Sequence, residues 1–189
     1  MHSRFEIHPW QVIENTLEPS DMRFSESLLS LGNGYMGLRG NLEEDYSGDS
    51  HRGTYLGGVW FPDKTRVGWW KNGYPEYFGK AINAMNLIGL HVKVNGQLVD
   101  AGFNQVLSFK RVLNMEKGTL RREMRVLVGG GEVTVRALRF VSMAQKNLLA
   151  IRYEVASSFP ARVEIEACLD GNVHNEDANY GEVFWDILD

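Results

Sequence analysis

Alternation of apolar and polar residues in the second half of the chain limits the fold more than any other feature. Every second side chain is apolar in residues 162–167, which predicts a strand with one buried and one solvent-exposed face. The same period of two runs through 120–128, where Arg122 interrupts an apolar row. The stretches 132–143 and 147–156 are rich in Val, Leu, Ile, Phe and Tyr, which favour strands. This half therefore predicts antiparallel β-structure.

Turn signals separate these runs. Asn95-Gly96 lies between two alternating runs and predicts a hairpin with a type I′ turn, which needs positive φ at both residues. Turns are also expected at 117–118, 129–132 and 157–160. Strands spaced by about 8–12 residues indicate a sandwich or a barrel. No stretch offers three good turns of amphipathic helix, and this argues against parallel α/β architecture.

Composition excludes several classes of protein. A chain of 189 residues with 43% hydrophobic residues can bury a core, so disorder is excluded, and one domain is expected, with two very small ones as the alternative. No apolar run approaches roughly 18 residues, so no membrane-spanning helix is expected. The net charge is −4 and the cations are scattered, which argues against nucleic acid as the main partner. The single Cys168 and the polar N-terminus predict a cytoplasmic protein without an internal disulfide or a secretory signal.

Two short motifs invite functional interpretations. Residues 32–37 match G-x-G-x-x-G, but Gly40 would interrupt the helix that a dinucleotide site needs, so a tight turn is favoured. The acidic run 43–45 could supply catalytic carboxylates, although a solvated acidic turn is favoured. Glu26 could pair with Arg23 or Arg39. The five histidines lack metal-binding spacing, so no metal site is predicted.

The segment 58–78 is the most unusual, with seven aromatic residues within 21. Aromatic faces stack on sugar rings, and they also anchor protein interfaces. Domain docking is favoured over direct sugar contact, and a local apolar cluster is the third interpretation. The candidates for substrate binding or domain docking are Trp69, Trp70, Lys71, Asn72 and Tyr74.

Residues 26–41 (ESLLSLGNGYMGLRGN) resemble the opening signature of glycoside hydrolase family 65, which holds inverting disaccharide phosphorylases. Residues 53–59, 81–86 and 118–122 continue the resemblance. Within the family, three stretches are similar to the maltose phosphorylases in particular: 60–75, 175–180 and 184–186. The resemblance covers nearly the whole chain.

The resemblance implies an all-β fold, an N-terminal antiparallel β super-sandwich of the galactose-mutarotase-like type. In the family, a helical linker, a catalytic (α/α)6 barrel and a small C-terminal sheet follow. Residues 1–189 are therefore expected to form the super-sandwich domain, incomplete at its C-terminal end and without the barrel. The general acid and the phosphate-binding residues of the family lie in the barrel. No catalytic residue is carried over to this chain, and the chain alone is expected to be inactive.

The chemistry that the resemblance implies is phosphorolysis of maltose to β-glucose 1-phosphate and glucose with inversion. Inorganic phosphate is the co-substrate, and no metal or organic cofactor is implied. The partners implied are the disaccharide, phosphate, the catalytic barrel and a second subunit in a homodimer, with no nucleic acid and no membrane. The alternatives are a relative acting on kojibiose, trehalose or nigerose, and a free-standing carbohydrate-binding or interaction module.

Overall fold

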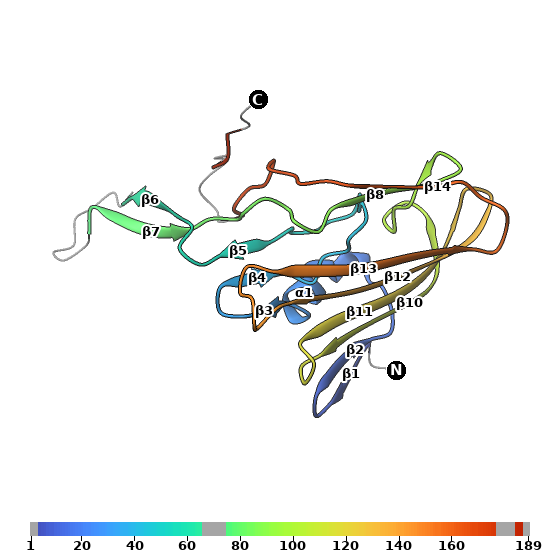
Figure 1. Cartoon of the computed structure of the whole chain (residues 1–189), viewed down its shortest axis with the longest axis horizontal. Helices are drawn as coiled ribbons and strands as arrows, with labels where there is room; N and C mark the ends of the chain where they lie inside the picture. Colours follow the sequence, from blue (N-terminus) through green and yellow to red (C-terminus); the bar gives the residue numbers. More distant parts are fainter. Residues whose placement is uncertain (1–3, 66–74, 177–183, 187–189) are drawn as a thin grey trace.

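The computed structural model describes residues 4–65, 75–176 and 184–186, and antiparallel strands dominate it (Figure 1). The all-β prediction is confirmed. The strands are β1 Phe5–His8, β2 Gln11–Glu14, β3 Leu31–Gly32, β4 Met36–Leu38, β5 Thr54–Leu56, β6 Trp60–Lys64, β7 Tyr77–Ala81, β8 Leu90–Val94, β9 Gln97–Leu98, β10 Gln105–Asn114, β11 Thr119–Val128, β12 Gly131–Val141, β13 Leu149–Ser157 and β14 Val163–Ala167. A 3-10 turn, η1 Pro19–Asp21, leads into the short helix α1 Met22–Leu28.

Two layers enclose the main core. The larger layer is a six-stranded antiparallel sheet in the order β1-β2-β10-β11-β12-β13, and the smaller is the three-stranded sheet β14-β8-β9. Val92 and Val94 of β8 pack with Met124 and Val126 of β11, and all four side chains are fully buried. The alternation read from residues 120–128 therefore faces this core. Two smaller sheets, β3-β4-β5 and β6-β7, continue from one end of the sandwich (Figure 1).

Three of the four predicted turns, 95–96, 117–118 and 129–132, contain glycines with positive φ. Asn95 and Gly96 have φ of 49° and 77°, which confirms the hairpin between β8 and β9. Gly129, between β11 and β12, has φ of 67°. A Cβ at Gly129 would lie 2.7 Å from both the carbonyl oxygen and Cγ1 of Val94 in the opposite layer. This turn therefore needs glycine for its backbone angle and for the close approach of β8.

Replacing Gly129 with Ala should destabilise the chain much more than replacing Gly96. Both positions have positive φ, but no atom lies within 4 Å of a Cβ at Gly96. Gly96→Ala should therefore cost only the left-handed backbone strain, about 1–2 kcal/mol. Gly129→Ala adds a clash with backbone and should cost more than about 3 kcal/mol. Urea midpoints of the two variants measure the difference, and equal midpoints would contradict the close approach.

The prediction that residues 162–167 form a strand with one buried and one solvent-exposed face is only half confirmed. Val163 and Ile165 are paired opposite Val94 and Val92, so their side chains lie on the core side of β14. They are nevertheless 38% and 50% exposed. This exposure means that the described strands leave the row partly uncovered. The alternation identified the correct face, but not whether a second layer covers it.

Helix α1 is too short to cross a membrane, and the described part of the chain contains no other α-helix. Its buried face is anchored by Met22, which is 1% exposed, and the chain leaves the helix through the fully buried Leu29. The chain then enters β3. This helix positions the loop 39–53, which runs between β4 and β5 and carries the polar residues discussed below.

Candidate binding surface at the aromatic hairpin

The ends of the aromatic segment form a hairpin that projects from the sandwich (Figure 1). Strands β6 and β7 pair along their length, and the amide of Thr65 donates to the carbonyl of Glu76 at 2.9 Å. Four rings of the hairpin are exposed by 39–59%: Trp60, Phe61, Tyr77 and Phe78. These rings do not fill the sandwich core. The five candidates Trp69, Trp70, Lys71, Asn72 and Tyr74 lie outside the described residues.

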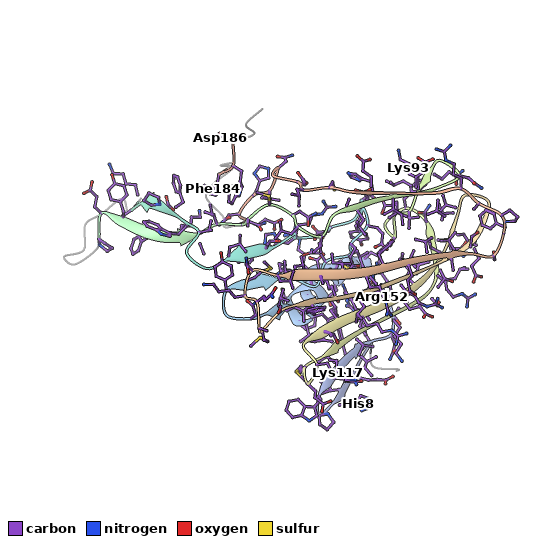
Figure 2. All side chains as sticks on the ribbon, in the orientation of Figure 1. His8, Lys93, Lys117, Arg152, Phe184 and Asp186 are labelled. Atoms are coloured by element: carbon purple, nitrogen blue, oxygen red, sulfur yellow. The ribbon has the colours of Figure 1, made fainter. Side chains whose placement is uncertain are left out.

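Residues 184–186 dock beside the base of this hairpin (Figure 2). The ring of Phe184 lies 5.1 Å from the ring of Phe61, measured between centroids. The Lys80 ammonium lies 5.7 Å from the Phe184 ring. The indole Nε1 of Trp185 donates to the carbonyl of Asn83 at 2.8 Å, just after β7. Phe184 and Trp185 therefore support the base of the hairpin.

A polar pocket of about 410 Å³ opens beside the end of β7, lined by Arg23, Arg39, His51, Tyr55, Ala81, Asn175 and Glu176. His51 contacts the Glu176 carboxylate through Nδ1 at 3.2 Å and the Tyr55 hydroxyl through Nε2 at 3.4 Å. Arg23 donates to Asp49 at 2.8 Å and to Glu176. The hydrogen bond to Asp49 is the main cause that raises the pKa of Arg23. The pocket thus combines donors, acceptors and a partly exposed ring, as a hydroxylated ligand requires.

The acidic run 43–45 is not a solvated turn, and that interpretation was wrong. Glu43 and Glu44 are 4% and 2% exposed. Arg122 Nη2 reaches Glu43 at 2.8 Å and Glu44 at 2.6 Å, and Arg139 Nη1 reaches Glu43 at 2.8 Å. Burial opposes the ionised carboxylate, but Arg139 and Arg122 outweigh it and lower the pKa of Glu43. These buried ion pairs attach the loop 39–53 to strands β11 and β12.

The signal for this network was present in the sequence. Arg122 and Arg139 occupy core-facing positions on β11 and β12, where a cation needs an acidic partner. An arginine that interrupts an apolar row therefore predicts a buried carboxylate. The sequence did not reveal which of the acidic residues supplies it, because the partners are 78 or more positions away.

Two other local predictions are confirmed. Gly34 has φ of 84° in the turn between β3 and β4, and the Asn33 side chain accepts hydrogen bonds from the amides of Tyr35 and Met36. The G-x-G-x-x-G match is therefore a hairpin turn followed by a strand. Glu26 pairs with Arg39 at 3.6 Å and also accepts from the amide of His51 at 2.9 Å. Among the described residues, no group of three or more His, Cys, Asp or Glu could hold a metal ion.

Comparison with known proteins identifies the family. Residues 12–189 match the family model described as "Glycosyl hydrolase family 65, N-terminal domain". The chain belongs to glycosyl hydrolase family 65. Within family 65 it is 54% identical over 182 residues to the protein named maltose phosphorylase from Bacillus subtilis (strain 168), covering 96% of this chain and 24% of that protein. It is 29% identical over 172 residues to the kojibiose phosphorylase of Halothermothrix orenii, covering 90% of this chain and 20% of that protein.

A solved structure of another protein has a similar fold. A protein from the human microbiome, assigned by name to the kojibiose phosphorylases, matches with a TM-score of 0.82 and 25% identity. The match covers 90% of this chain and 23% of that one. The chain thus spans about a quarter of the length of the relatives that it matches. The resemblance to the family and to its β-sandwich fold is confirmed.

Proposed function

We propose that residues 1–189 form the N-terminal sandwich domain of an inverting maltose phosphorylase. The 54% identity to the Bacillus subtilis protein, over 96% of this chain, carries the proposal. Identity to the Halothermothrix orenii kojibiose phosphorylase is 29%, so kojibiose is the second candidate substrate. Trehalose and nigerose are further alternatives within the family, and a free-standing carbohydrate-binding module is the alternative outside it.

In the full-length enzyme, a carboxylic acid of the barrel protonates the glycosidic oxygen of maltose. Inorganic phosphate attacks the anomeric carbon from the opposite face, in the place that water takes in an inverting hydrolase. The products are β-glucose 1-phosphate and glucose, and the reaction needs no metal or organic cofactor. We place this enzyme in the cytoplasm as a homodimer, without nucleic acid or membrane partners.

In this proposal, the role of the domain is to support the catalytic barrel. The β6–β7 hairpin carries its exposed rings away from the sandwich, and rings of this type anchor docking surfaces. We assign Trp69, Trp70, Lys71, Asn72 and Tyr74, at its far end in sequence, to the mouth of the barrel's active site, in the same subunit or across the dimer. The polar pocket beside β7 lies at the base of the same hairpin.

A chimera tests the proposal directly. The matched 182-residue region of the Bacillus subtilis maltose phosphorylase is replaced by this chain, and β-glucose 1-phosphate is measured with maltose and phosphate. Activity within about tenfold of the parent is expected, because the domain would present equivalent surfaces to the barrel. The matched control carries the Halothermothrix orenii domain and should be much less active. A folded but inactive chimera of this chain would contradict the proposal.

The isolated chain should not phosphorolyse or hydrolyse maltose. The two buried carboxylates, Glu43 and Glu44, are held as ion pairs, and the catalytic acid is assigned to the barrel. The assay incubates the purified chain with maltose, with and without phosphate, and measures glucose and glucose 1-phosphate. Turnover above the uncatalysed background would place catalytic groups in this domain and refute the assignment.

A further inference from the structure

Two segments of chain that differ in stiffness attach the hairpin β6–β7 to the sandwich. Among the described residues its strands pair only with each other, so no neighbouring strand fixes its direction (Figure 1). The segment that enters β6 contains Gly57 and Gly58, and Gly58 has φ of 85°. Glycine restricts the backbone least of all residues, so this segment alone would allow the hairpin many directions. A fixed direction therefore depends on the segment that leaves β7.

The segment after β7 is held at Asn83, which is 2% exposed and hydrogen-bonded at every polar group. Its Oδ1 accepts from the amide of Thr54, the first residue of β5, at 2.8 Å. Its Nδ2 donates to the carbonyl of Arg52 at 2.6 Å and to that of His174 at 3.2 Å. The asparagine side chain thus joins the end of the hairpin to the sheet β3-β4-β5 and to a segment 91 positions later.

Asn175 and Trp185 hold the backbone of Asn83. The Oδ1 of Asn175 accepts from the amide of Asn83 at 2.7 Å, and its Nδ2 donates to the carbonyl of the last residue of β7 at 2.9 Å. The indole Nε1 of Trp185 donates to the carbonyl of Asn83 at 2.8 Å. Phe184, beside it in sequence, contacts Phe61 of β6. Both strands of the hairpin are therefore tied at their base.

We propose that Asn83 is a positioning residue for the hairpin. Held by Asn175 and Trp185, it fixes the direction in which β6–β7 leaves the sandwich, and with it the place of the exposed rings in the full-length enzyme. Only the effect on the reaction rests on the proposed function, in which the hairpin meets the catalytic barrel. The direction itself can be measured in the 189-residue chain alone.

Two substitutions remove the hydrogen bonds to the Asn83 backbone without opening the core. Asn83→Ala itself would leave the buried amide of Thr54 unsatisfied and can prevent folding. Asn175→Ala removes both bonds of one side-chain amide, and Trp185→Phe removes the indole N–H but keeps an aromatic ring. Neither residue belongs to the two buried apolar clusters, so the sandwich should stay folded.

The direction of the hairpin is measured as the distance between two spin labels in a Cys168→Ser background. Glu76→Cys labels the start of the hairpin strand β7, and Arg152→Cys labels the solvent side of β13. Double electron–electron resonance should give one narrow distance distribution for the parent. The double variant Asn175→Ala/Trp185→Phe should broaden it at least about twofold, because fewer restraints then oppose the freedom of the glycine segment. Circular dichroism should show an intact sandwich.

Asn172→Ala and Trp10→Phe are the matched controls. Asn172 is an exposed residue three positions before Asn175. Trp10 lies in the turn between β1 and β2 and is 60% exposed. The hydrogen bonds of Asn83 involve neither residue, so neither control should change the distance distribution.

The effect on the reaction is measured in the chimera with the Bacillus subtilis barrel. The double variant should raise the KM for maltose about tenfold and leave kcat within about twofold, because a displaced binding surface is lost equally to the ground state and the transition state. The KM for phosphate should not change, since the phosphate site is assigned to the barrel.

A distance distribution as narrow in the double variant as in the parent would overturn the proposal, whatever the kinetics. Broadening of the same size in the two controls would overturn it as well. A broadened distribution with an unchanged KM for maltose in an active chimera would break the link between the hairpin and maltose use. An inactive chimera of the parent chain would instead reject the proposed function, and the label distances would still decide the role of Asn83.

Discussion

Arg122→Ala should remove a large part of the folding stability of the isolated chain. The guanidinium is 2% exposed and donates to both Glu43 and Glu44, which are themselves buried. Removing it leaves Glu44 without its arginine and Glu43 with Arg139 alone. Breaking a buried ion pair from one side costs about 3–5 kcal/mol, because an uncompensated charge stays in the core. A chain of this size has about 5–15 kcal/mol of stability in total.

Arg121→Ala is the matched control for this variant. It removes the same side chain one position earlier on β11, where Arg121 is exposed on the outer face of the sheet. Its cost should stay within about 0.5 kcal/mol. Urea unfolding followed by tryptophan fluorescence gives both values. If Arg122→Ala cost no more than Arg121→Ala, the loop 39–53 could not depend on this network.

Trp70→Ala and Tyr74→Ala should weaken maltose use or dimer assembly by roughly 30- to 1000-fold in the chimera with the Bacillus subtilis barrel. The basis is the projecting hairpin β6–β7, whose described rings are exposed rather than packed in the core. Losing one anchor ring in a docking surface costs about 2–4 kcal/mol. If these two rings belong to a docking surface, as proposed, the melting temperature of the isolated chain should not change, because their loss leaves no core cavity.

Trp10→Ala provides the control for a lost tryptophan. Trp10 lies in the turn between β1 and β2, is 60% exposed, and belongs to a different sheet from the hairpin. It should alter neither kinetics nor assembly. The outcome that would reject the role of the hairpin is unchanged kinetics and assembly together with a melting temperature several degrees lower, which would place these rings in a core.

Local patterns predicted the strands better than the contacts between them. The alternation in residues 120–128 and the Asn95-Gly96 turn depend on neighbours within a few positions, and both predictions were correct. The burial of Glu43 was not predicted, because its partners Arg122 and Arg139 are far away in sequence. Ile165 was also mispredicted. Alternation correctly placed its side chain on the core side of β14, but it did not show that the side chain would remain half-exposed. The candidates at 69–74 lie outside the described residues and remain predictions.

The bond between Glu14 and Arg111 has a consequence for synthesis of the protein on the ribosome. These residues are 97 positions apart, and strand β2 pairs with β10 through the same region. At about 5–20 residues per second, β2 therefore waits roughly 5–20 s for its neighbour to be made. The later strands β10 to β13 follow one another directly and can pair as they emerge. The nascent chain thus carries an N-terminal hairpin, β1–β2, whose β2 edge stays unpaired for seconds, when chaperone binding would matter most.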